Sequence, residues 1–141
     1  MIVIDGKLIA KKRNTIHSEF NWASHAEANL LRENSNVIKK RKKDKKKVKV
    51  ELYTTLEPCL MCLGSAVLHR VTRIVYACPD PFGGAAKINP KNLTKWYERK
   101  WPKISFGLYK KESYEMVINF LKNNFYDTKF TKEFEKIGKN I

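Results

Sequence analysis

Residues 48–62 read VKVELYTTLEPCLMC and join two kinds of local pattern. Apolar and polar side chains alternate at the start of this stretch, which predicts a half-buried strand over Val48–Thr55. The spacing then changes to that of a helix, which we expect over residues 58–69. A second strand is expected over residues 71–77, where β-branched residues gather. Strand, helix and strand in this order indicate an α/β fold.

The rest of the chain continues the alternation. Asp5-Gly6 is a type I′ hairpin signal near the start of the sequence. A helix is expected from His25 to about Ile38, with Ser24 as its N-cap. The remaining expected elements are strands over 1–4, 8–12 and 103–108, and helices over 89–99, 111–123 and 126–138. We therefore predict a three-layer α/β/α sandwich with a mixed, roughly five-stranded sheet.

The chain carries a formal net charge of +15 over 141 residues, a length that suits one domain spanning 1–141. More than half of this charge lies in residues 39–49, which hold nine basic residues and one acidic residue. We expect a solvated lysine-rich loop or a frayed helix end at about 39–47, and an extra helical segment at about 126–141. The positive charge elsewhere suits a polyanionic partner such as RNA better than a free, uncharged base.

Other global features indicate an intracellular protein. No apolar run approaches 18 residues and no basic, then apolar leader opens the sequence, so we expect no membrane association. The three cysteines suggest a reducing compartment rather than a disulfide framework. We therefore expect a cytoplasmic protein.

A histidine and two cysteines form a candidate zinc site. Cys59 and Cys62 are three residues apart, so on a helix they share one face. His25 would add a third ligand and leave the fourth position to water. Glu27 is not needed to hold metal, but a carboxylate at this position can move a proton. The combined pattern, H-x-E with P-C-x-x-C, is typical of zinc-dependent nucleobase deaminases.

Two alternatives compete for the cysteines. A C-x-x-C pair is common in structural zinc sites and in redox motifs. Cys78 could supply a third thiol and, with His25, close a structural Cys3His site. That interpretation leaves Glu27 and Pro58 without a purpose. We therefore favour a catalytic zinc ion, and expect Cys78 to be a small buried residue at a strand end.

The motif stretches resemble a known family. Thr55–Cys62 has Leu-Glu before the proline and Met before the second cysteine, and 71–78 resembles the strand that follows. The sequence is similar to the cytidine deaminase-like superfamily, and within it to tRNA adenosine deaminases, which make inosine at the anticodon wobble position. The likeness covers about residues 3–121.

The resemblance implies a zinc-dependent hydrolytic deamination of adenosine in a tRNA anticodon loop, carried out by a homodimer. It implies specific residues for each role. These are His25, Cys59 and Cys62 for zinc, Glu27 for proton transfer as the catalytic residue, and Asn14, Ala26 and Asp80 for substrate binding.

Two departures from the family leave the substrate open. Family members have a helix before the strand in which this sequence starts, and a shorter connection than residues 39–47. One alternative is a deaminase of a free base, nucleoside or nucleotide, of the cytosine, guanine or deoxycytidylate type. Another is a non-catalytic, zinc-stabilised basic protein that binds RNA or assists an active subunit.

Overall fold

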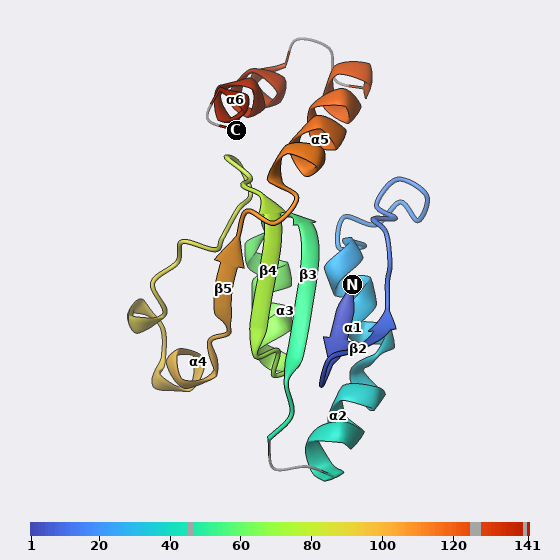
Figure 1. Ribbon diagram of the computed structural model, residues 1–141, viewed down its shortest axis with the longest axis vertical. Coiled ribbons are helices and arrows are strands. Elements are labelled where there is room, and N and C mark those ends of the chain that lie inside the picture. The colour runs from blue at the N-terminus through green and yellow to red at the C-terminus, as the bar shows by residue number, and fades with distance from the viewer. Residues whose placement is uncertain (45–46, 125–127, 140) are drawn as a thin grey trace.

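The computed structural model describes residues 1–44, 47–124, 128–139 and 141. Its strands form one sheet in the order β2-β1-β3-β4-β5 (Figure 1). The strands are β1 (Ile2–Ile4), β2 (Lys7–Ala10), β3 (Val50–Leu56), β4 (Arg73–Cys78) and β5 (Lys103–Phe106). β1 is antiparallel to β2 and β3, whereas β3, β4 and β5 are parallel. The predicted mixed, five-stranded sheet and the α/β fold class are confirmed.

The hairpin between β1 and β2 turns at Asp5 and Gly6. Both residues have positive φ angles, 51° and 81°, as a type I′ turn requires. The turn places Ile4 opposite Lys7. The hairpin predicted from Asp5-Gly6 is therefore confirmed, and it adds two antiparallel strands to one edge of the parallel strands.

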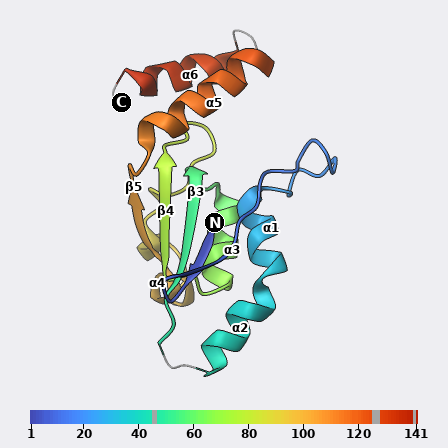
Figure 2. The ribbon, with the colours of Figure 1, turned by 45° about the vertical axis from the view of Figure 1, so that its right-hand side comes forward.

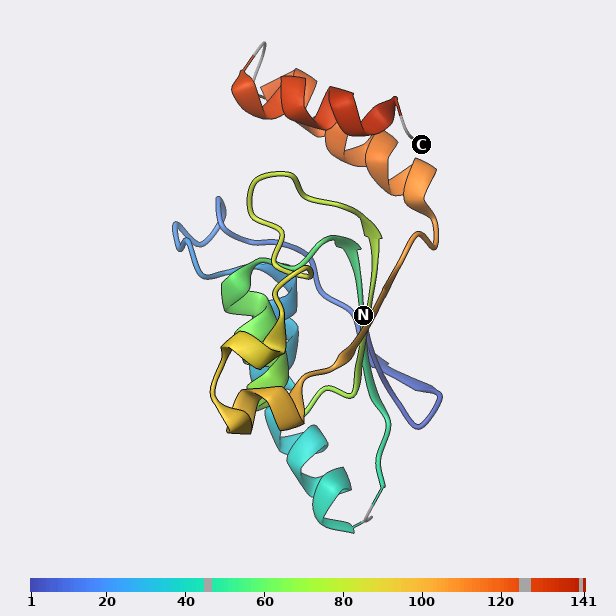
Figure 3. The same ribbon diagram turned by 90° about the vertical axis from the view of Figure 1, so that its left-hand side faces the viewer.

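The helices lie in two groups. They are α1 (Ala26–Glu33), α2 (Ser35–Asp44), α3 (Leu60–Leu68), α4 (Lys95–Lys100), α5 (Lys110–Asn124) and α6 (Lys129–Gly138), with a 3-10 turn at Pro90–Asn92. Seen edge-on, α1, α3 and α4 lie on one side of the sheet (Figure 3), and α1 lies beside α3 (Figure 2). Helices α5 and α6 pack against each other across the end at which β3 and β4 finish. None of the helices in the described part of the chain has the length and apolar character needed to span a bilayer.

The main core lies between the sheet and helices α1 and α3. Alternate strand residues and one stripe of each helix contribute fully or almost fully buried side chains: Ile2, Ile4, Val50, Leu52, Ile74, Leu30, Leu31, Leu63 and Ala66. A smaller cluster joins the end of β4 to α5 and α6 through Cys78, Ile118 and Phe134. Because α1 and α3 pack on the same strands and on each other, their N-terminal ends are held side by side.

The helix predicted from His25 to Ile38 is wrong in its length. The structure has two helices, separated at Asn34. The Asn34 side-chain amide donates a hydrogen bond to the Leu30 carbonyl at 2.8 Å, and its backbone N–H donates to the same oxygen at 3.2 Å. Asparagine side chains compete with the backbone in this way, which explains the break.

For residues 39–47 the sequence predicted a solvated loop or a frayed helix end. The loop is wrong over most of this length, because α2 remains helical to Asp44. Lysine and arginine are good helix formers, and their charged ends reach water here while Ile38 anchors the helix in the core. Residues 45 and 46 lie outside the described residues. The predicted C-terminal helix is present as α6, and Tyr126, at its expected start, lies outside the described residues too.

Candidate active site

Three side chains from two helix N-termini converge at the carboxyl end of β3. His25 is the N-cap residue of α1, Cys59 is the N-cap residue of α3, and Cys62 lies in the first turn of α3. The His25 Nδ1 atom lies 3.6 Å from the Cys59 Sγ atom, and the three ligand atoms lie within 4.8 Å of one another. Tetrahedral ligands 2.0–2.3 Å from a zinc ion are roughly 3.5 Å apart. One nitrogen and two sulfur donors at these separations fit zinc.

Helices α1 and α3 start at other residues than predicted, and this leaves the His25 and Cys59 side chains free of capping bonds. Ser24 is not the N-cap of α1: it is fully buried, and its hydroxyl donates to Glu19 at 2.7 Å. Helix α3 starts at Leu60, not at Pro58. Neither His25 nor Cys59 makes a side-chain capping bond to its own helix. Their donor atoms therefore remain available to a metal ion, next to two positive helix ends.

The two thiols influence each other's ionisation. The pKa of Cys59 is lowered to about 5, chiefly because Cys62 donates a hydrogen bond to the Cys59 thiolate. The same contact, together with burial, raises the pKa of Cys62. A pair of thiols on its own thus favours one thiolate beside one thiol. A divalent cation supplies the positive charge that ionises both, as zinc coordination requires.

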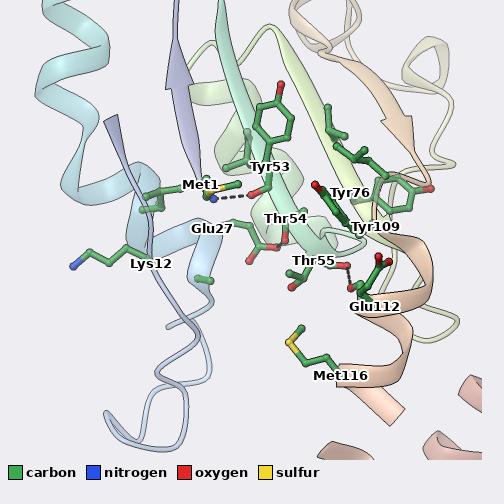
Figure 4. A pocket seen from close by; sticks show the side chains of 17 residues that line it. Met1, Lys12, Glu27, Tyr53, Thr54, Thr55, Tyr76, Tyr109, Glu112 and Met116 are labelled. Atoms are coloured by element: carbon green, nitrogen blue, oxygen red, sulfur yellow. Dashed lines mark hydrogen bonds between the residues drawn. The ribbon is translucent and has the colours of Figure 1, made fainter. Parts of the chain in front are cut away.

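Glu27 lies beside the ligand group without belonging to it. Its Oε1 atom accepts a hydrogen bond from the Thr54 hydroxyl at 2.8 Å, and both residues line the pocket shown in Figure 4. Its Oε2 atom lies 3.7 Å from the Cys62 Sγ atom. One carboxylate oxygen is therefore anchored to β3, and the other faces the ligand group. We did not predict a role for Thr54. The available signal was a polar residue on the same strand face as Val50 and Leu52, which are fully buried.

A pocket of about 420 Å³ opens next to Glu27 (Figure 4). Ala26 and Glu27 line it from α1, and Tyr109 and Met116 line it from the opposite side. On that side, the Ser113 hydroxyl of α5 donates a hydrogen bond to the Thr55 carbonyl of β3. This volume suits one small organic group such as a nucleobase. The pocket therefore brings a ligand within reach of the Glu27 carboxylate.

The start of the chain forms part of the same pocket wall. The Met1 amino group donates a hydrogen bond to the Tyr53 carbonyl at 2.7 Å (Figure 4). Burial lowers the pKa of this amino group, and the negative charge of Glu27 acts in the opposite direction. The Met1 amino group and the Glu27 carboxylate therefore line the same pocket and interact electrostatically.

Of the three predicted substrate-binding residues, the structure brings only Ala26 to the pocket. Asn14 is exposed, and its side-chain oxygen accepts a hydrogen bond from the Ile16 N–H at 2.9 Å. Asp80 likewise accepts hydrogen bonds from the Phe82 and Gly83 N–H groups, at 2.9 and 3.1 Å. Both side chains shape their own loops, as asparagine and aspartate often do in turns.

Cys78 is not a metal ligand in this arrangement. It is fully buried at the end of β4, as predicted, and the candidate metal group found among the described residues consists of His25, Cys59 and Cys62. Burial raises the pKa of the Cys78 thiol, and its sulfur does not belong to the group of ligand atoms that lie within 4.8 Å of one another. The closed Cys3His alternative is therefore contradicted.

Glu57 has a structural role that the sequence motif did not reveal. Its side chain is almost fully buried and accepts hydrogen bonds from the Asp80 N–H at 3.1 Å and the Ala86 N–H at 2.9 Å. The loop that carries these donors also forms a β-bridge between Gly84 and Cys59. The Glu57 hydrogen bonds thus hold this loop next to Cys59, the N-cap residue of α3, and so support the position of one metal ligand.

Gly84 is packed so closely in this loop that a larger residue should not fit. An added Cβ atom would lie 2.5 Å from the Asp80 carbonyl oxygen and 2.5 Å from the Glu57 carboxyl carbon. We expect Gly84→Ala to lower the free energy of unfolding by about 1–3 kcal/mol, measured by urea denaturation. Gly64→Ala is the matched control, because nothing lies within 4 Å of its Cβ position in α3. Equal stability of the two variants would contradict the role given to this loop.

Comparison with known proteins supports this site. Residues 1–78 match the family model described as the cytidine and deoxycytidylate deaminase zinc-binding region, which is more than half of the chain. The chain belongs to this family. It is therefore a zinc-dependent deaminase, and the match spans all three candidate ligands and Glu27. The family predicted from residues 55–62 and 71–78 is confirmed.

Two relatives extend the similarity beyond the zinc region of this deaminase. A tRNA-specific adenosine deaminase of Agrobacterium fabrum is 28% identical over 122 residues, which cover 86% of this chain and 78% of the relative. Another, of Buchnera aphidicola, is 32% identical over 128 residues, covering 87% and 78%. A solved structure from work on A-to-I editing by tRNA:A34 deaminases at the wobble position of transfer RNA has a TM-score of 0.65 and 28% identity, covering 82% of this chain and 80% of that one.

Proposed function

We propose that this deaminase is a cytoplasmic enzyme that converts adenosine to inosine at the wobble position of a tRNA anticodon. The observation that carries the proposal is the position of Glu27, which lines a base-sized pocket beside three zinc-compatible ligand atoms without being one of them. The names of the Agrobacterium and Buchnera relatives support adenosine in tRNA as the substrate.

Glu27 is the proposed proton carrier. Zinc held by His25, Cys59 and Cys62 would lower the pKa of a water molecule to about 7. Glu27 takes a proton from the attacking water and delivers it to a ring nitrogen of the base. A bond forms from the water oxygen to the carbon that carries the amine. Glu27 then takes the second proton from that oxygen and gives it to the amino nitrogen, and the carbon–nitrogen bond breaks to release ammonia. The Thr54 hydrogen bond to Oε1 keeps the carboxylate oriented through both transfers.

The surroundings of the pocket support a nucleic-acid substrate. The target base must leave its stack, and this costs least in a single-stranded loop such as an anticodon loop. The net charge of +15 favours binding of its phosphates. Ala26 remains the proposed contact to the base inside the pocket. Asn14 and Asp80 remain proposed substrate contacts. Asn14 lies on the loop that precedes His25, and Asp80 lies on the loop that pairs with Cys59 through Gly84.

The proposal includes a homodimer formed through α3. Three apolar side chains of this helix are substantially exposed, with fractional exposures of 66% for Leu60, 40% for Met61 and 60% for Leu68. Apolar groups gathered on one exposed helix favour burial against a second surface. A copy of the same helix would supply such a surface.

Ammonia release from defined substrates tests the function. We expect an anticodon stem-loop with adenosine at the wobble position to release ammonia and to gain about one mass unit per molecule, because an amine is replaced by oxygen. The same RNA with guanosine at that position is the control and should not react. Efficient turnover of free adenosine, cytidine, deoxycytidylate or guanine without RNA would contradict the tRNA assignment. Zinc-loaded protein that releases no ammonia from any of them would contradict catalysis altogether.

A further inference from the structure

A second pocket lies at the opposite end of the sheet from Glu27. It has a volume of about 450 Å³, and its floor includes Val48, Val71 and Trp101, which precede β3, β4 and β5. Helices α2 and α4 approach this end of the sheet, away from α5 and α6 (Figure 1). Four cationic side chains line it: Lys42 from α2, Arg70 between α3 and β4, and Arg99 and Lys100 at the end of α4. We call these four residues and the space between them the basic pocket.

The charges of the basic pocket are not neutralised by ion pairs among the residues that the structure describes. Across residues 1–44, 47–124, 128–139 and 141, none of its four cations takes part in an ion pair. The pKa of Lys42 is lowered, first by burial and then by the charges of Arg70 and Lys100, and Asp5 only partly offsets this. Four like charges around one hollow repel one another, so the arrangement becomes favourable when an anion binds.

Arg70 is held in place by an unusual backbone. It directly follows the C-cap residue of α3 with a φ of 59°, in a position where glycine is favoured. The N–H groups of Arg70 and Val71 donate back to the Val67 and Ala66 carbonyls, which completes the helix end. A side chain at this position costs backbone energy. The cost suggests that the side chain of Arg70 is itself useful.

The Arg70 side chain is oriented but incompletely bonded. Its guanidinium carbon lies 4.8 Å from the centre of the Trp96 ring, which fixes the plane of the group. Its Nη1 atom is shielded from water and has no hydrogen-bond partner among the described residues. A buried donor without an acceptor is unfavourable. A phosphate oxygen is an acceptor that matches the geometry of a guanidinium group.

We infer that the basic pocket is a second phosphate-binding site, which holds the backbone of the RNA far from the base being deaminated. Strand β3 runs from the basic pocket to the active site, and its seven residues span about 20 Å at about 3.3 Å each. Four cations around an open hollow suit successive phosphates of a strand better than one small anion. The inference rests on the proposed function, because it assumes an RNA substrate.

The test compares two double variants with the same loss of charge. Lys42→Gln with Lys100→Gln removes two cations of the basic pocket, both in side chains that reach solvent. Lys39→Gln with Lys40→Gln removes two exposed cations of α2 that do not line it. We expect the first variant to raise the Kd for a fluorescent tRNA transcript about tenfold, and to reduce the slope of log Kd against log salt by about two. Its kcat on the same RNA should equal that of the wild type, because neither residue approaches Glu27.

Each outcome of this comparison is decisive. An unchanged Kd in the first variant, or an equal rise in both variants, would overturn the inference in favour of diffuse charge. Inorganic tripolyphosphate gives a second check. If it binds tightly, and the first variant abolishes this binding without changing tRNA binding, the site serves a small anion and the inference is overturned. Arg70→Lys, which keeps the charge and loses the planar fork, should also raise the Kd, and an unchanged Kd would contradict the role of Arg70. Binding is measured without turnover, so this comparison does not depend on the deamination assay. If the wild-type protein binds tRNA but deaminates only free nucleosides, the proposed function is contradicted, while the comparison of the two variants still tests the basic pocket.

Discussion

Glu27→Gln is expected to lower the rate of deamination at least about 100-fold, the lower range of what proton transfer by a positioned side chain contributes. Glutamine keeps the size of the side chain and can still accept a hydrogen bond from Thr54, but it cannot carry a proton at neutral pH. The zinc content should remain that of the wild type, because Glu27 is not one of the three ligands. Inosine formation measured by mass, together with elemental analysis for zinc, checks both expectations.

Glu33→Gln is the matched control for this experiment. Glu33 lies on the same helix, exposed, in a surface ion pair with Lys12. Its replacement should leave the rate within about a factor of two, since a surface ion pair contributes at most about 1 kcal/mol. Unchanged turnover in Glu27→Gln would remove this residue from catalysis. Loss of zinc in Glu27→Gln would instead make the carboxylate a fourth ligand.

Cys62→Ala should remove the metal and much of the stability that depends on it. Cys62 is fully buried and provides one of the three ligand atoms. Zinc binds the folded chain and not the unfolded one, so at a free concentration 100 times its Kd it adds about 2.7 kcal/mol to stability. We expect less than about one tenth of an equivalent of zinc in the variant. A chelator should lower the Tm of the wild type but leave that of Cys62→Ala unchanged.

Cys78→Ala separates metal loss from simple loss of packing. Cys78 is also a fully buried cysteine, and it lies outside the ligand group. Its replacement should lower stability by about 1 kcal/mol through lost contacts and keep a full equivalent of zinc. Zinc retention in Cys62→Ala, or zinc loss in Cys78→Ala, would show that the wrong thiol has been assigned to the metal.

The parts of the fold that were predicted correctly depend on local chemistry. The Asp5-Gly6 turn follows from the backbone freedom of two neighbouring residues, and β3 follows from the alternation in residues 50–56. The same holds for the ligands. A C-x-x-C pair at a helix start and a histidine followed by an alanine and a glutamate can be interpreted without knowing the rest of the structure.

The errors arose where a choice depends on a single competing bond or on distant packing. The break at Asn34 depends on a side-chain amide that bonds the Leu30 carbonyl, which periodicity does not show. The substrate-binding roles of Asn14 and Asp80 stay predictions, but their positions in the sequence did not show that both side chains bond to neighbouring N–H groups in their own loops. Helix α2 continues through the lysines because Ile38 is anchored in the core.

The basic pocket could not have been predicted by any reading of local pattern. Its cations come from residues 42, 70 and 99–100, which meet only because α2, the end of α3 and α4 arrive at the same end of the sheet. The lysine-rich stretch gave a correct expectation of positive charge but no indication of which lysine would face Arg70. Such sites depend on topology and on side-chain direction, which single-sequence patterns do not contain.

The bond between the Met1 amino group and the Tyr53 carbonyl has a practical consequence for recombinant work. If residues were joined ahead of Met1, an amide N–H would replace the amino group, and these residues would begin at the wall of the pocket that Glu27 also lines. We expect an affinity tag joined there to lower the activity, because it would begin beside the space that the substrate needs. A tag joined after Ile141 would begin at a residue that does not line this pocket.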